Sequence, residues 1–137
     1  MATSGTRATT DEAVLRQVME RTTQAWADHD PAAFAQVFAK DTKVVIAGHY
    51  LQSRDEVRTY ISVAFSGPVK GTQVIMNPVS AEFMSADTGL VVTEGGILLP
   101  GETSVAAERA IWGTWVLAME DREWRIRAYH SSPVARS

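Results

Sequence analysis

Three side chains that could carry out chemistry fall in the strand-rich second half of the chain: Glu94, Arg109 and His130. An arginine can hold an anionic or carbonyl oxygen of a ligand, and a carboxylate beside it can orient the arginine or move a proton. An imidazole exchanges protons close to neutral pH. We therefore expect Glu94 and His130 as catalytic residues and Arg109 as a substrate-binding residue. The alternatives are a plain Glu94–Arg109 salt bridge and a structural, hydrogen-bonded His130.

These side chains share a face only in one strand register, because a slip of one residue turns a whole strand over. Two-residue turns are predicted at three places: Ala86-Asp87, Gly101-Glu102 and Asp121-Arg122. With these turns, Glu94 pairs with Arg109, and His130 and Asn77 point to the same inward face, while Tyr129 points outward. Asn77 could orient a ligand carbonyl there or satisfy a neighbouring backbone group.

Aromatic residues on the predicted helices and strands could form the wall of a ligand site. Three of them, Trp26, Tyr60 and Trp115, lie at positions that are expected to face inward. Such a wall suits a flat apolar ligand, although the same pattern is also typical of core packing. The substrate-binding candidates are therefore Trp26, Tyr60, Asn77, Arg109 and Trp115.

Periodicity predicts the elements that would position these residues. Three helices are expected: one from a capping box at Thr9–Glu12, one begun by Asp30-Pro31, and one capped at Ser53 and ended by Gly67-Pro68. Six strands are expected at Thr42–Ala47, His49–Gln52, Gln73–Met84, Leu90–Leu99, Val105–Glu120 and Trp124–His130. This order predicts an α+β fold, a cone-shaped curved antiparallel sheet of about six strands with three helices packed on its concave side. We expect a flexible tail at 1–9, one domain at 10–133 and a C-terminal tail at 134–137.

The outer face of this sheet is expected to be more apolar than a solvated face. Trp112 and Val116 would lie on it. A second copy of the chain could cover these side chains, which predicts a homodimer packed through the outer sheet face. The alternative is that Trp112 lies on the surface beside arginine stems.

Composition excludes several classes of function. The 137 residues include 13 Lys and Arg against 16 Asp and Glu, a net charge of −3, which argues against a nucleic-acid partner. There is no cysteine, and the three histidines are scattered, so no metal or other cofactor is expected. No apolar run suits a signal peptide or a membrane span, so we expect a cytoplasmic protein without membrane contact.

The motifs occur in an order that resembles a known superfamily. They are Trp26, Asp30-Pro31-Ala32-Ala33-Phe34, Gly48, Gly95-Gly96, Pro100-Gly101-Glu102, Arg109 and the ending Trp124-Arg125-Ile126-Arg127-Ala128-Tyr129-His130. The chain resembles the nuclear-transport-factor-2-like superfamily of ketosteroid isomerase, scytalone dehydratase and SnoaL-type polyketide cyclases, and within it most resembles the SgcJ/EcaC family. In ketosteroid isomerase an aspartate on the first strand acts as the base. The matching region of this chain is Val45-Ile46-Ala47, which has no ionisable group, so steroid-type proton transfer by that residue is not expected.

The resemblance implies a role in secondary metabolism. It implies binding of a small hydrophobic oxygenated metabolite, polyketide-like and including those of enediyne pathways, and its conversion by cofactor-free proton transfer. Cyclisation, isomerisation or dehydration would each fit. Two alternatives stay open: a non-catalytic protein that binds or sequesters such a ligand, and a dimerising accessory module with a filled core.

Overall fold

The computed structural model describes residues 3–135, with side chains described for residues 12–135. Its first helix, α1 (Thr3–Ala27), begins before the capping box predicted at Thr9, so that predicted start is wrong. No proline interrupts this segment, and each residue added to an existing helix gains a backbone hydrogen bond. Residues 1 and 2 of the predicted N-terminal tail, and 136 and 137 of the predicted C-terminal tail, lie outside the described residues.

The two shorter helices begin where their capping residues predict. α2 (Pro31–Gln36) has Asp30 as its N-cap, and the Asp30 carboxylate accepts a hydrogen bond from the Ala33 amide at 3.1 Å. α3 (Arg54–Ser66) has Ser53 as its N-cap, whose hydroxyl oxygen accepts a hydrogen bond from an amide of the first turn. Each cap satisfies an N–H group that has no partner within the helix, so both predictions are confirmed.

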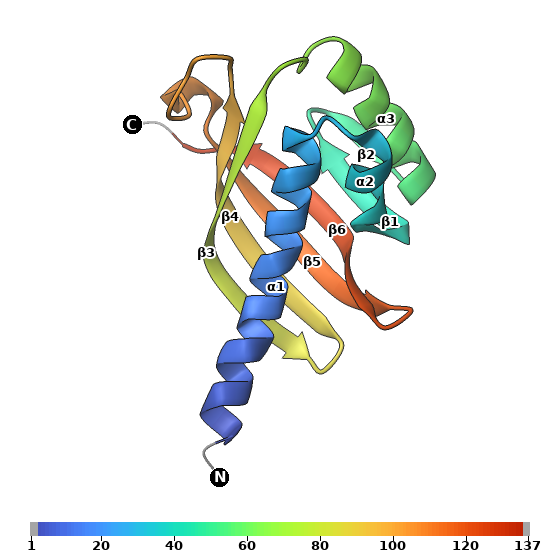
Figure 1. Cartoon of the computed structure of the whole chain (residues 1–137), viewed down its shortest axis with the longest axis vertical. Helices are drawn as coiled ribbons and strands as arrows, with labels where there is room; N and C mark the ends of the chain where they lie inside the picture. Colours follow the sequence, from blue (N-terminus) through green and yellow to red (C-terminus); the bar gives the residue numbers. More distant parts are fainter. Residues whose placement is uncertain (1–2, 136–137) are drawn as a thin grey trace.

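The remaining elements form one six-stranded sheet in the order β2-β1-β6-β5-β4-β3. Its strands are β1 (Phe38–Ile46), β2 (His49–Leu51), β3 (Gln73–Ser85), β4 (Thr88–Leu98), β5 (Ile111–Glu120) and β6 (Glu123–Pro133). All neighbours are antiparallel except β1 and β6, which run parallel. The three helices lie on one face of the curved sheet, with α1 running along it and α2 and α3 over β1 and β2 (Figure 1). The predicted fold class is confirmed.

The connection between β4 and β5 differs from the prediction. A strand was expected from Val105, but Ala107–Arg109 forms a 3-10 turn and β5 begins only at Ile111. This connection packs directly over the end of β4: a Cβ on Gly96 would lie 2.7 Å from the Arg109 carbonyl oxygen. The predicted two-residue turn and the strand position of Arg109 are therefore wrong.

A β-bulge at Arg127 decides which side chains of β6 face the helices. Leu117 pairs with Ile126, as the predicted turn requires, but the next residue, Val116, pairs with Ala128. Arg127 is therefore an extra residue on β6. Its guanidinium donates a hydrogen bond to a backbone carbonyl of β1 instead of joining the alternation.

Beyond this bulge the alternation of β6 is inverted. Tyr129 pairs with Trp115 and is buried, whereas His130 pairs with Thr114 and is exposed. The predictions that His130 faces inward and Tyr129 outward are wrong. The physical reason is that one extra residue exchanges the two faces of every position after it.

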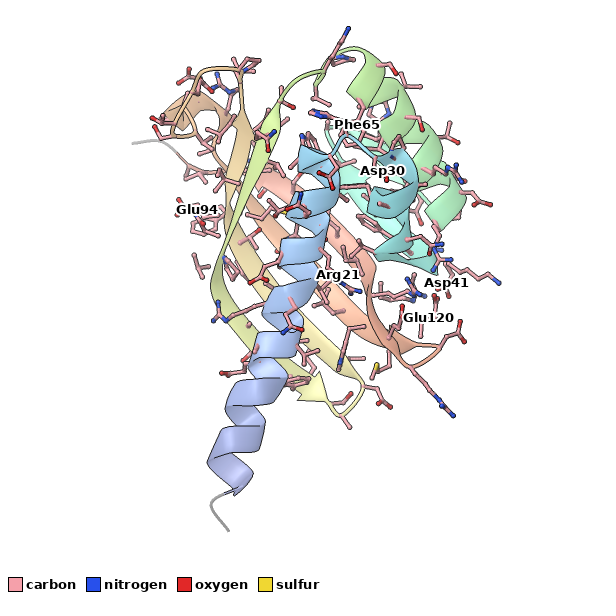
Figure 2. The ribbon with its side chains drawn as sticks, viewed as in Figure 1. Arg21, Asp30, Asp41, Phe65, Glu94 and Glu120 are labelled. Atoms are coloured by element: carbon pink, nitrogen blue, oxygen red, sulfur yellow. The ribbon has the colours of Figure 1, made fainter. Side chains whose placement is uncertain are left out.

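The other predicted polar side chains also face outward: Asn77 because β3 contains an extra residue, and Glu94 because β4 pairs with β5 in a register that places it opposite Trp112. Met84 and Val79 lie at register shifts between β3 and β4. After these shifts Asn77 pairs with Glu94, and both are exposed on the sheet face turned away from the helices. Figure 2 shows Glu94 beside β3 and β4, on the side of these strands away from α1. The predicted inward placement of Asn77 and Glu94 is wrong.

A carboxylate at the end of β5 connects the last hairpin to the helical part of the molecule. Glu120 Oε1 lies 2.8 Å from Arg54 Nη2 and 3.3 Å from Arg125 Nε, and Oε2 accepts a hydrogen bond from the Lys40 amide at 2.9 Å. Its side chain is 23% exposed, so water screens these interactions less than at the open surface. Glu120 thus joins β5, β6, β1 and α3 (Figure 2).

We expect Glu120→Gln to lower the free energy of unfolding by about 1–2 kcal/mol, because it removes the charge from two charge-assisted contacts. Urea denaturation measures the change. Glu123→Gln is the control: its carboxylate is 56% exposed and contacts Arg125 alone, so its loss should stay below about 0.5 kcal/mol. Equal losses in the two variants would contradict this role for Glu120.

Candidate functional site

The face of the sheet under the helices is closed by aromatic side chains. The rings of Trp115 and Tyr129 are stacked with centroids 3.8 Å apart, and Trp115 is 1% exposed. Trp115 Nε1 donates a hydrogen bond to Thr93 Oγ1 at 2.9 Å, which satisfies the buried indole N–H. A Cβ on Gly113 would lie 2.6 Å from Thr93 Oγ1 and 2.9 Å from Trp115 Nε1, so this part of the interior is close-packed.

The second predicted tryptophan closes the interior from the helix side. Trp26 is 6% exposed and meets Phe34 and Phe65 edge-on, at 5.9 Å and 5.3 Å between ring centroids. Its Nε1 donates a hydrogen bond to Thr72 Oγ1 at 3.1 Å. The inward placement expected for Trp26 and Trp115 is confirmed, and both side chains have the contacts of core residues.

Two further predicted residues lie apart from this interior. Tyr60, on α3, is half-buried against His49 of β2, with ring centroids 5.2 Å apart. Arg109 forms an ion pair with Glu102, and both side chains are 30% exposed. The pKa of the Glu102 carboxyl is lowered from its ordinary value. The largest cause is its hydrogen bond with the Arg109 side chain, and the next is its hydrogen bond with the Leu99 amide. The predicted Glu94–Arg109 pair does not form.

Only one side chain within the buried part of residues 12–135 can ionise, and it is Tyr129. Burial raises the pKa of Tyr129 to about 12, and a hydrogen bond with Ser131 opposes the shift. At neutral pH the phenol therefore keeps its proton and can donate a hydrogen bond, but it cannot accept a proton as a base. The other buried polar side chains are threonines.

The opposite face of the sheet, which we call the outer face, carries a band of exposed apolar side chains mixed with polar ones, here called the apolar band. One row of paired residues crosses all six strands: Tyr50, Val45, His130, Thr114, Val92 and Ser80. The rows beside it contain Trp112 and Val116 on β5, as predicted. Trp112 is 38% exposed, Val45 40% and Tyr50 55%. Val45 and Tyr50 were not singled out in the sequence, because only the parallel pairing of β1 with β6 brings them to this band.

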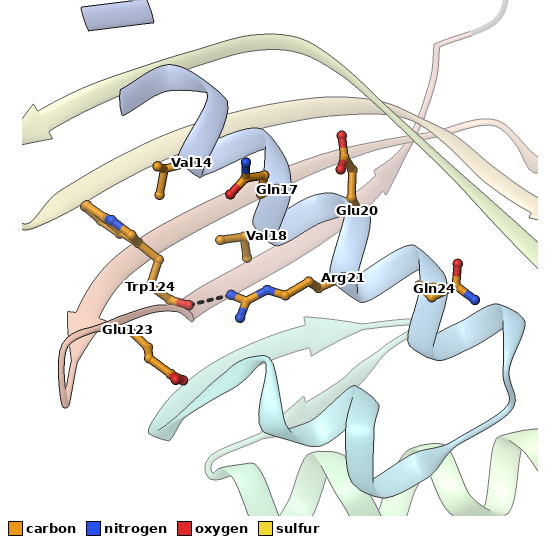
Figure 3. Close-up of a pocket in the computed structure, with 8 residues that line it drawn as sticks. All are labelled: Val14, Gln17, Val18, Glu20, Arg21, Gln24, Glu123 and Trp124. Carbon is orange, nitrogen blue, oxygen red and sulfur yellow. Dashed lines mark hydrogen bonds between the residues drawn. The ribbon is translucent and has the colours of Figure 1, made fainter. Parts of the chain in front are cut away.

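Three hollows of the surface lie beside α1, outside the close-packed interior. One groove of about 640 Å³ runs between α1 and the start of β6 (Figure 3). Its walls include Val14, Val18 and Arg21 from the helix and Trp124 from the strand. The sequence gives no sign of this groove, since its two sides are about one hundred residues apart.

Candidate metal sites and membrane-spanning helices are both absent from the described part of the chain. Residues 12–135 contain no group of three His, Cys, Asp or Glu side chains that could hold a metal ion. No helix among the described residues has the length and apolar character needed to cross a membrane.

The chain matches the model of the SnoaL-like domain over residues 15–136. No curated protein matches the chain. A domain of unknown function with a cystatin-like fold from Nostoc punctiforme is 24% identical and superimposes with a TM-score of 0.84, over 93% of this chain and 80% of that one.

Two other solved structures carry functional names. A protein of the NTF2-like family from Streptomyces avermitilis, provisionally called a dehydratase, is 20% identical with a TM-score of 0.77, over 93% of this chain and 98% of that one. A Thiobacillus denitrificans protein, provisionally called a calcium/calmodulin-dependent protein kinase type II association domain, is 18% identical with a TM-score of 0.73, over 86% and 93%. At these identities the structures show a shared fold, and the match over residues 15–136 shows that the chain belongs to the SnoaL-like domain family.

Proposed function

We propose that this SnoaL-like domain is a homodimerising module whose outer sheet face is its interface. The observation that carries the proposal is the apolar band on that face, which exposes Trp112, Val45 and Tyr50. Large apolar side chains that adjoin one another on a surface are typical of protein contacts. Trp112 lies at one edge of the band, beside Glu94 and Ser132, and tryptophan is typical of the residues that contribute most to binding.

Polar side chains surround the band in the manner of an interface rim. Asn77 and Glu94 lie at one end of the neighbouring row, and Lys43 and Glu82 lie at the ends of the row through Val116. Charged groups at a rim remain hydrated, whereas a charge in the centre would lose its water. Because both copies would present the same face, the contact closes on itself as a symmetric dimer.

The close-packed interior supports a non-catalytic module. Trp26, Trp115 and Tyr129 occupy the space in which a ligand would meet its acid and base, and each has protein partners already. Proton-transfer chemistry needs a group that exchanges its proton near neutral pH. No Asp, Glu, His or Lys within residues 12–135 is buried.

A second candidate function is conversion of a small hydrophobic oxygenated metabolite by cofactor-free cyclisation, isomerisation or dehydration. Membership of the SnoaL-like family, the resemblance to SgcJ/EcaC proteins and the Streptomyces avermitilis neighbour support it by analogy of fold. A polyketide or enediyne pathway would be its setting. The candidate donor in the interior is the Tyr129 phenol, which could hold a ligand oxygen if the aromatic side chains opened.

We expect the wild-type chain to sediment as a dimer of twice its 15.0 kDa mass, and Trp112→Glu to sediment as a monomer. The new carboxylate would lose its hydration in the interface, and the dissociation constant should rise at least about a hundredfold. Val63→Glu is the matched control, because Val63 is 67% exposed on α3 and should leave the dimer intact. A monomeric wild type, or an unchanged mass in Trp112→Glu with native circular dichroism, would refute the proposed interface.

The ionisation of Tyr129 tests the argument against proton transfer. In an absorbance titration at 295 nm, one of the three tyrosines should ionise only near pH 12, and Tyr129→Phe should remove that step. Because the pKa of Tyr129 is higher in the folded chain than in the unfolded chain, the protonated phenol stabilises the fold fully below pH 10. This stabilisation, about 2–3 kcal/mol, is lost as the pH rises from about 10 to 12. Ionisation of Tyr129 well below pH 10 would make it a usable base and would favour the catalytic candidate.

A further inference from the structure

The groove between α1 and β6 has an apolar floor and one aromatic wall. Val14 and Val18 come from the helix, and Val18 is only 1% exposed. Trp124 forms the wall, and its indole meets Phe83 edge-on at 5.6 Å, which fixes the plane of the ring. The volume of about 640 Å³ lies within the range of small-molecule sites.

One cation in this groove has unused hydrogen-bonding capacity. Arg21 Nη2 donates one hydrogen bond to the Trp124 carbonyl oxygen at 2.9 Å, which holds the guanidinium beside the indole (Figure 3). Within residues 12–135, no carboxylate lies within 4 Å of Arg21. A guanidinium has five N–H donors in a planar fork, so the others are free for a planar anion.

The two acidic residues of the groove do not oppose an anion at this position. Glu123 Oε2 is 2.7 Å from Arg125 Nη2, so its charge is already paired. The Glu20 carboxylate points away from Trp124 in Figure 3, on the other side of α1 from the Arg21 guanidinium. The local charge next to the indole is therefore that of Arg21.

We propose that this groove binds a small carboxylate with a flat apolar body, with the carboxylate on Arg21 and the body against Trp124. A bidentate carboxylate fits the arginine fork, and a flat ring fits a fixed indole face. The groove lies on the helix side of the sheet, so it stays open when the outer face is covered by a second copy. The proposal therefore does not depend on the dimer.

The apolar body of the ligand can be larger than one ring system. A second hollow of about 510 Å³ adjoins the groove and shares Arg21, Gln24 and Glu123 with it. Ala25 and Val37 add apolar surface on that side. A carboxylate at Arg21 could therefore carry its apolar body over Trp124 and still leave room for a substituent toward α2.

The test is a titration of the full chain with 2-naphthoate, followed by calorimetry and by the indole N–H resonance of Trp124, which is assigned with Trp124→Phe. The wild type should bind with a shift of that resonance. Arg21→Met should weaken binding at least about tenfold, because the charge-assisted pair is lost while the alkyl stem remains. The uncharged 2-naphthamide should bind the wild type about tenfold more weakly than 2-naphthoate.

Arg16→Met is the matched control. Arg16 is exposed on the same helix but lines a hollow toward β3 and not the groove itself, so this variant changes the net charge equally and should bind 2-naphthoate as the wild type does. Absence of binding to the wild type at millimolar 2-naphthoate, equal affinity in Arg21→Met, or an equal loss in Arg16→Met would each overturn the proposal. Circular dichroism of both variants checks that the fold is retained.

Discussion

The contact on which the two faces of this molecule depend is the stack of Trp115 on Tyr129. It exists because Arg127 is an extra residue in β6, so that Tyr129 rather than His130 turns toward the helices. Arg127 makes this arrangement possible by leaving the alternation and binding the carbonyl oxygen of Asp41 on β1. The remaining ladder bonds on both sides of the bulge then form normally.

One change of alternation has opposite effects on the two faces. Under the helices it brings a large aromatic ring onto Trp115, which closes the space that the fold could otherwise leave for a ligand. On the outer face it places His130 in one row with Val45 of β1 and Thr114 of β5, next to the row that contains Trp112. The bulge in β6 therefore explains the closed interior, whereas the outward position of Trp112 and Val116 follows from the alternation of β5.

The sequence predicts local structure well where a single residue type has a specific backbone partner. Asp30 and Ser53 accept hydrogen bonds from the first turns of their helices, and the turn residues Asp121 and Arg122 both adopt the positive φ of a tight hairpin. The inward position of Trp26 also follows from helical spacing. Each of these features depends on interactions within a few residues of the chain.

The candidate site could not be predicted in the same way, because it depends on alternation along whole strands. Val79 is an ordinary strand residue in composition, yet as an extra residue of β3 it puts Asn77 on the outer face. Glu94 faces outward because the long β4–β5 connection pairs it with Trp112 instead of Arg109. The groove beside Trp124 depends on a helix and a strand from opposite ends of the chain. Neither a bulge nor a long-range contact leaves a periodic signal that a single sequence can reveal.

The most direct test of this account is a nuclear Overhauser measurement between aromatic side chains in solution. Because the centroids of the Tyr129 ring and the Trp115 indole are 3.8 Å apart, we expect strong contacts between them and none between His130 and the indole. Contacts from the His130 imidazole to Trp115, with Tyr129 free of them, would mean that β6 alternates without the bulge. That result would exchange the two faces of β6 beyond Ile126 and contradict the closed interior.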